Sequence, residues 1–206
     1  MKRKANFGGL YVVTREDQHL LEKVEIALLA GAKVIQFRDK SSAVKERLSL
    51  SIRLKELCSQ YSALFIVNDD IDLAKKVAAD GLHIGKNDAN FSAVRAQLPD
   101  KIIGVSCYND LSLAVKAQAQ GADYVAFGRF FFSHTKPNAV PADKSLLLAA
   151  KNSIRIPIVA IGGITPSNGK DLLTAGADML AVIDGLFSVA DTQKTALAYV
   201  NLFKRK

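Results

Sequence analysis

The chain contains few cysteines, no tryptophan and no long apolar run. Only Cys58 and Cys107 occur among its 206 residues, and two isolated thiols give neither a disulfide framework nor the spacing of a cysteine metal site. No apolar run approaches the ~20 residues that cross a bilayer, and the basic start lacks the apolar stretch of a secretory signal. We therefore expect a cytoplasmic protein with no membrane partner.

Acidic residues are outnumbered, with 20 Asp+Glu against 28 Lys+Arg, which gives a net charge of +8. Such a balance fits nucleic acid, an anionic membrane surface or anionic substrates. Much of the excess lies in two basic tails, residues 2–4 and 204–206, which read most simply as solvated chain ends. A nucleic-acid-binding protein would need a basic stripe interleaved with aromatics. Aromatics make up only 7% here without such a motif, so we expect no nucleic-acid partner.

Short apolar runs alternate with longer segments of helical periodicity along the whole chain. The helical spacing is clearest at Leu48, Ile52 and Leu54, and again at Leu111, Ala114 and Val115. Continuous apolar runs are typical of parallel strands buried on both faces. The runs cover residues 10–13, 34–37, 64–67, 81–84, 102–105, 124–127, 158–161 and 180–183.

Eight such repeats favour an α/β fold, a single (β/α)8 TIM barrel with short helices, spanning residues 1–206 as one domain. Gly31, Gly121 and Gly176 precede the second, sixth and eighth runs, where glycine ends a helix at little cost. The alternative is an open doubly wound sheet. It would be expected to carry G-x-G-x-x-G after the first strand, and residues 14–17 there read Thr-Arg-Glu-Asp.

In a barrel of this kind, chemistry takes place at the carboxyl ends of the strands. Gln36 and Arg38 alternate with the apolar Ile35 and Phe37, so we expect both to point into the barrel mouth, with Lys40 following in the loop. This set favours an anionic ligand.

Acidic residues follow the third and fourth runs. Asp69 and Asp88 would lie on neighbouring strands, close enough to share a Mg2+ ion. Asp70 is expected to cap the helix that begins near Ile71. Helix capping remains an alternative for Asp88 as well.

The later loops offer hydroxyls, glycines and cations. The long connection at 128–144 carries Ser133 and a Lys-containing stretch that can bind phosphate and fold over a ligand. Gly162-Gly163, with a helix expected near Thr165, and residues 183–185 occupy the usual phosphate site of this fold. We interpret His134 as an exposed spacer and Cys107 as structural.

Together these motifs resemble the thiamine phosphate synthase family, and the similarity covers nearly the whole chain. The resemblance rests on the ordered set of residues 36–40, 67–70, 83–85 with Asp88, 135–136 and 161–165. It implies a transferase that joins hydroxymethylpyrimidine diphosphate to thiazole phosphate with Mg2+, releasing pyrophosphate and giving thiamine phosphate. Small phosphorylated molecules would be its partners, and a homo-oligomer is possible.

The resemblance also implies a role for each matching residue. The pyrimidine diphosphate would be held by Gln36, Arg38, Lys40, Asn68, Ser106 and Lys136, of which Arg38, Lys40, Lys136 and Ser106 would be catalytic. Mg2+ would be bound by Asp69 and Asp88. The thiazole phosphate would be held by Ser133, Thr135, Gly163, Ile183 and Asp184.

Three positions depart from the family pattern. Asp184 stands where many members have a serine against the thiazole phosphate, Lys86 replaces a commoner glutamine, and Arg129 replaces a commoner proline. A carboxylate beside a phosphate is unfavourable, although the Asp184 N–H can still bind if the side chain turns away. The nearest rival function is that of the thiazole tautomerase relatives, which use the same barrel but would not be expected to need Arg38, Lys136 or the acidic pair.

Overall fold

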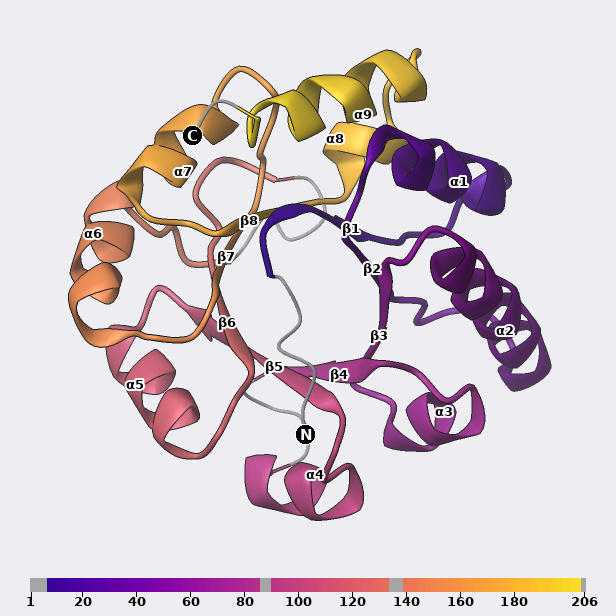
Figure 1. Cartoon of the computed structure of the whole chain (residues 1–206), viewed down its shortest axis with the longest axis horizontal. Coiled ribbons are helices and arrows are strands. Elements are labelled where there is room, and N and C mark those ends of the chain that lie inside the picture. The colour runs from indigo at the N-terminus through magenta and orange to yellow at the C-terminus, as the bar shows by residue number, and fades with distance from the viewer. Residues whose placement is uncertain (1–6, 86–89, 134–138, 205–206) are drawn as a thin grey trace.

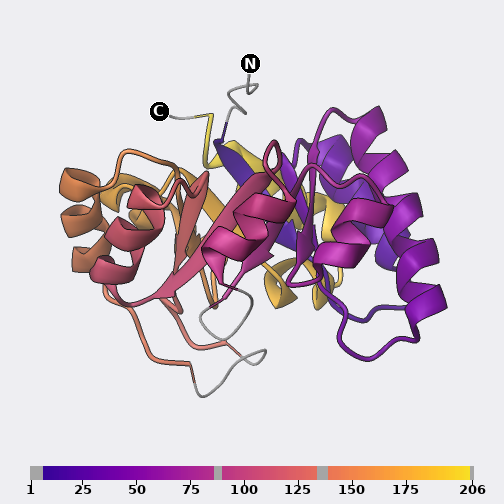
Figure 2. The same ribbon diagram turned by 90° about the horizontal axis from the view of Figure 1, so that it is seen from below.

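The strands of the molecule close into a parallel barrel. The computed structural model describes residues 7–85, 90–133 and 139–204. Each strand pairs with its sequence neighbours in parallel, and β8 pairs with β1 to close the barrel. Figure 1 shows this ring of strands with the helices outside it, and Figure 2 shows the same arrangement from the side. The predicted (β/α)8 barrel is confirmed.

The elements alternate as expected. The strands are β1 (Gly9–Val13), β2 (Val34–Phe37), β3 (Leu64–Asn68), β4 (Gly81–Ile84), β5 (Ile102–Tyr108), β6 (Tyr124–Phe127), β7 (Ile158–Ile161) and β8 (Met179–Val182). The helices are α1 (Leu20–Ala30), α2 (Val44–Gln60), α3 (Ile71–Lys76), α4 (Phe91–Gln97), α5 (Leu111–Ala119), α6 (Lys144–Ser153), α7 (Gly169–Ala175), α8 (Asp184–Phe187) and α9 (Thr192–Asn201). None of these helices has the length and apolar character needed to span a bilayer.

The structure corrects several predicted boundaries. β5 runs on to Tyr108, with a register shift against β6 between Ser106 and Tyr108. The helix expected near Thr165 begins at Gly169, because the Asn168 side chain accepts a hydrogen bond from the Thr165 N–H at 2.8 Å and holds residues 165–168 in a turn. The four-residue α8, which follows β8 directly, was not predicted.

Apolar side chains pack on both faces of the strands. Alternate residues such as Val34, Ile66 and Met179 fill the barrel interior, whereas Ile35 and Phe37 pack outward beneath the helices. This double burial explains why the strands read as continuous apolar runs.

The helical segments are where the sequence predicts, but their buried faces are rotated from the expected ones. Ile52 and Val115 are 43% and 42% exposed, while Leu54 and Ala114 are fully buried. Outside the barrel, α9 packs against α1 and completes the helical layer (Figure 1).

Candidate active site

A cavity of about 380 Å³ opens at the carboxyl ends of the strands, and we call it the mouth cavity. Side chains of β2 to β5 form one wall and the loops after β6, β7 and β8 form the other. The residues that line it include Gln36, Arg38, Asn68, His83, Ser106, Arg129, Phe132, Ser133, Gly162, Gly163, Ile183 and Asp184. The size suits a small organic ligand.

The first wall carries the predicted cationic group. Gln36 and Arg38 both line the cavity, as the alternation along β2 predicts. The backbone of Arg38 is fixed by buried Thr14, whose hydroxyl accepts from the Arg38 N–H at 2.8 Å. Lys40 lies in the following loop, where its Nζ is 3.7 Å from Asp69 Oδ2. Arg38 therefore lines the cavity, whereas Lys40 and Asp69 pair with each other and are not among its lining residues.

Asp69 and Asp70 are adjacent but have different surroundings. Asp69 has a left-handed φ of 62°, which is uncommon outside glycine and is best tolerated by Asn and Asp. Its carboxylate accepts from Asn68 Nδ2 at 2.6 Å. Asp70 instead caps α3 through the Leu73 N–H and pairs with Arg47 at 2.6 Å, so its predicted capping role is confirmed.

The second wall is built largely from backbone. Gly162 and Gly163 have φ values of 105° and 61°, and a Cβ at Gly163 would overlap the carbonyl oxygen of Phe132. Ser133, Ile183 and Asp184 line the same side. Glycine therefore lets two loops approach closely where the sequence predicts a phosphate site.

Several predicted positions lie outside the described residues. These are Asp88, Thr135 and Lys136, together with Lys86 and His134. Among residues 7–85, 90–133 and 139–204, no group of three or more His, Cys, Asp or Glu side chains is gathered as in a protein-only metal centre.

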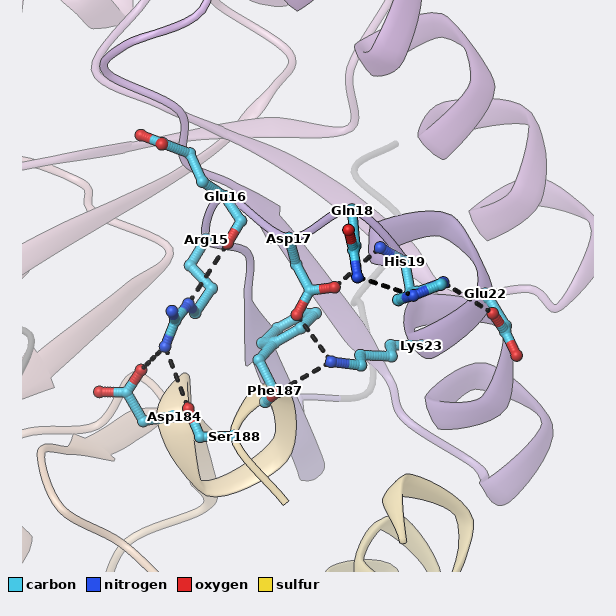
Figure 3. Close-up of polar contacts among 10 residues, drawn as sticks. All are labelled: Arg15, Glu16, Asp17, Gln18, His19, Glu22, Lys23, Asp184, Phe187 and Ser188. Atoms are coloured by element: carbon cyan, nitrogen blue, oxygen red, sulfur yellow. Dashed lines mark hydrogen bonds and ion pairs between the residues drawn. The ribbon is translucent and has the colours of Figure 1, made fainter. Parts of the chain in front are cut away.

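Asp184 forms an ion pair that the sequence did not suggest. Figure 3 shows Arg15, from the loop after β1, reaching α8, where its Nη1 lies 2.6 Å from Asp184 Oδ1 and 3.0 Å from Ser188 Oγ. The Asp184 carboxylate is thus directed to a guanidinium at the edge of the mouth cavity. Arg15 lies beyond the end of a strand like the predicted residues, and this position was the only signal for it.

A second ion pair beside it anchors α8 to α1. Lys23 Nζ donates to Asp17 Oδ2 at 2.7 Å and to the Phe187 carbonyl oxygen at 2.9 Å (Figure 3). Burial alone would raise the pKa of Asp17, but the Lys23 ammonium and the His19 N–H lower it overall. These contacts fix α8, whose first residue is Asp184, against α1.

Polar residues inside the barrel were also missed. Ser106 Oγ lies 2.8 Å from His83 Nε2, and Gln36 Nε2 donates to the Tyr11 hydroxyl at 3.1 Å. Strand alternation places Tyr11 on the inward face of β1, and that pattern could have identified it. His83 and Tyr11 thus form hydrogen bonds with Ser106 and Gln36, two of the predicted ligand-binding residues.

Arg129 and Cys107, both singled out in the sequence, have different surroundings. Arg129 lines the cavity, lies 5.8 Å from the ring of Phe132 and donates from Nε to the Ala139 carbonyl oxygen. Cys107 is fully buried, and burial raises the pKa of its thiol to about 12. A protonated, buried thiol fits the structural interpretation of this cysteine.

Comparisons with known proteins agree on one family. A model of the thiamine monophosphate synthase family matches residues 10–186. The chain is 50% identical over 189 residues to a thiamine-phosphate synthase of Alcanivorax borkumensis, covering 89% of this chain and 87% of the relative. It is 46% identical to the one of Thiobacillus denitrificans, covering 95% of each.

Solved structures extend the comparison to three dimensions. Thiamine phosphate pyrophosphorylase from Pyrococcus furiosus superposes with a TM-score of 0.90 at 33% identity, covering 98% of both chains. A geranylgeranylglyceryl phosphate synthase from Thermoplasma acidophilum has a TM-score of 0.73 at 17% identity, covering 98% of this chain and 96% of the other. The second likeness shows a shared fold only.

Proposed function

Because the chain belongs to the thiamine monophosphate synthase family, we propose that it condenses 4-amino-5-hydroxymethyl-2-methylpyrimidine diphosphate with 4-methyl-5-(2-hydroxyethyl)thiazole phosphate. The products are thiamine phosphate and pyrophosphate. The observation that best supports this reaction is the division of one cavity into a wall with Gln36, Arg38 and Asn68 and a backbone wall around Gly163. Two anionic substrates need two such anion sites facing one another.

The first wall would hold the pyrimidine diphosphate. Arg38 and Lys40 would bind the diphosphate, Asn68 would fix its orientation, and Gln36 and Ser106 would hold the ring; Lys136 would add a third cation. Charge-assisted hydrogen bonds from Arg and Lys to phosphate oxygens are among the stronger protein hydrogen bonds. They would also stabilise the negative charge that develops as the diphosphate leaves.

The acidic residues fit a magnesium ion shared with the substrate. Asp69 offers a carboxylate at the end of β3, and Asp88 would be the second ligand. Mg2+ typically takes one or two carboxylates and completes its shell with water and substrate phosphates. When bound, the ion would neutralise diphosphate charge.

The second wall would hold the thiazole phosphate. The backbone N–H groups of Asp184 and Gly185 lie at the start of α8, and both residues line the cavity. With Gly163, Ile183, Ser133 and Thr135 they would bind the phosphate and aim the thiazole nitrogen at the pyrimidine methylene carbon.

The reaction needs no general base. Loss of diphosphate from the electron-rich aminopyrimidine gives a dissociative step, and the thiazole nitrogen attacks with its own lone pair. The C–O bond to diphosphate breaks and a C–N bond forms without any proton leaving the nucleophile. This agrees with the protonated state of the buried Cys107 thiol and with the hydrogen bond between the His83 imidazole and Ser106.

A thiazole tautomerase is the weaker alternative, because an isomerisation without diphosphate gives no reason for Arg38 in the cavity wall or for Lys40 beside Asp69. The cytoplasmic location, the single domain and the absence of nucleic-acid partners stay predictions from the sequence.

The test is a coupling assay with both substrates, with Mg2+ or with EDTA, on the wild type, Asp69→Ala and the matched control Asp70→Ala. We expect metal-dependent thiamine phosphate and pyrophosphate from the wild type and the control, and a large loss in Asp69→Ala. Folded wild-type protein that yields no product would refute the proposal, and tautomerase activity would then be assayed.

A further inference from the structure

A continuous chain of hydrogen bonds crosses the barrel interior and connects two residues of the mouth cavity. From Gln36 Nε2 it passes to Tyr11 OH at 3.1 Å, then to Tyr124 OH at 2.8 Å. Tyr124 OH lies 2.9 Å from His83 Nδ1, and His83 Nε2 lies 2.8 Å from Ser106 Oγ. Both ends, Gln36 and Ser106, line the cavity.

The barrel is built to accommodate this chain. Tyr124 is fully buried, and its ring fills the space in front of Gly104, its register partner on β5, where a Cβ would overlap the phenol. The His83 ring stacks on Tyr124 with centroids 5.6 Å apart and the planes inclined by 24°. The phenols are therefore held by packing as well as by hydrogen bonds.

The direction of these hydrogen bonds depends on which groups carry a proton. Burial raises the pKa of Tyr11 and of Tyr124 far above the ordinary value, so each phenol carries one proton to donate. Gln36 Nε2 donates to the Tyr11 hydroxyl, whereas either phenol can be the donor between Tyr11 and Tyr124, and the His83 tautomer sets the roles at Nδ1. Each proton is used once along the chain when Tyr11 donates to Tyr124 and Tyr124 donates to His83 Nδ1. A neutral imidazole that accepts at Nδ1 carries its proton on Nε2.

The direction of the chain decides what the cavity offers to a ligand. In this arrangement His83 Nε2–H, 2.8 Å from Ser106 Oγ, is the donor of that hydrogen bond, which leaves the Ser106 hydroxyl proton for a ligand in the cavity. At the other end Gln36 uses an N–H for Tyr11 and keeps its Oε1 as an acceptor. An aminopyrimidine has the complementary groups, namely ring nitrogens that accept and an exocyclic amine that donates.

We propose that Tyr11, Tyr124 and His83 are positioning residues that fix Ser106 as a hydrogen-bond donor and Gln36 as an acceptor for the aminopyrimidine. This inference rests on the proposed function, in which Gln36 and Ser106 hold the pyrimidine ring. It assigns pyrimidine selectivity to residues buried in the barrel, two of which do not line the cavity.

The kinetic test uses Tyr124→Phe, Ser106→Ala and the double variant, with Tyr61→Phe as control because its hydroxyl bonds Glu25 at the surface. Tyr124→Phe should raise KM for the pyrimidine diphosphate about 3- to 10-fold, the factor for one neutral hydrogen bond. The KM for the thiazole phosphate should not change. Because Tyr124 acts through Ser106, the double variant should resemble Ser106→Ala alone.

Multiplied effects in the double variant, or an equal rise in both KM values, would overturn the proposal by showing a general structural role. If Tyr124→Phe does not fold, Tyr11→Phe tests the Gln36 end in the same way.

A second measurement needs no substrate. Imidazole nitrogen NMR of the wild type, with His83→Asn to assign the signals, should show a neutral ring protonated at Nε2. A proton on Nδ1, or a charged ring, would refute the direction of the chain. Because the wild-type coupling assay tests the overall reaction separately, failure of this inference and failure of the proposed function are distinguishable.

Discussion

Replacing Arg15 by alanine removes a cation from the edge of the predicted thiazole phosphate site. Arg15 pairs with the Asp184 carboxylate at 2.6 Å (Figure 3). Asp184 lines the cavity where a phosphate is proposed to bind. Without the guanidinium, the carboxylate would repel the phosphate more strongly, so Arg15→Ala should weaken thiazole phosphate binding.

The size of the effect follows from the exposure of the pair. The side chains of Arg15 and Asp184 are 43% and 29% exposed, so water and salt screen their interaction. Partly solvated ion pairs contribute up to about 1 kcal/mol, which corresponds to about a fivefold change in affinity. We therefore expect KM for the thiazole phosphate to rise by up to about fivefold at low ionic strength, and less in high salt.

A double-mutant cycle separates neutralisation from direct binding. KM for each substrate is measured for the wild type, Arg15→Ala, Asp184→Ser and the double variant. If Arg15 acts by offsetting Asp184, the effect of Arg15→Ala should disappear in the Asp184→Ser background. Lys144→Ala, which breaks an exposed pair with Asp171, is the matched control and should change neither KM.

Two results would refute this reasoning. An unchanged KM in Arg15→Ala would mean that the Asp184 carboxylate does not influence the phosphate. An equal loss in both backgrounds would show that Arg15 itself contacts the substrate.

Three further predictions concern the loops and the core. Gly163→Ala should raise KM for the thiazole phosphate and lower the melting temperature in a thermal scan, because a left-handed φ and the Phe132 carbonyl leave no room for a Cβ; unchanged values for both would contradict the predicted site. Asp70→Ala should lower the free energy of unfolding in urea by about 1 kcal/mol through loss of the α3 cap and the Arg47 pair, with kcat unchanged. Cys107, with a thiol pKa of about 12, should resist alkylation at pH 8 in the folded protein, since only about one thiol in ten thousand is then ionised; rapid labelling before unfolding would show that it is exposed.

The barrel could be predicted because its signals are local and repeated. Continuous apolar runs identified every strand to within a few residues, and glycines such as Gly31, with a φ of 113°, ended the helices as expected. The buried face of each helix was harder, since Ile52 is exposed although it fits the apolar spacing. Tertiary packing, rather than periodicity alone, determines which apolar residue is covered.

The cavity wall formed by β2 could be predicted for the same reason. The alternation of side chains along a single strand places Gln36 and Arg38 inward, and no knowledge of distant residues is needed. Asp69 and Asp70 could be separated as well, because Asp70 directly precedes the helix expected near Ile71. The structure gives the two residues different backbones: Asp69 takes a φ of 62° and contacts Asn68, whereas Asp70 caps α3.

What the sequence did not reveal are pairings between distant segments. Arg15 and Asp184 are 169 positions apart, and Tyr11 and Tyr124 are 113 apart. Each of these residues has an unremarkable local context, and its partner is set by how β1, β6 and β8 meet around the closed barrel. The consequence is chemical as well as structural. A carboxylate that reads as unfavourable for a phosphate site gains a nearby guanidinium, and a tyrosine that reads as core contributes a proton donor beneath the cavity.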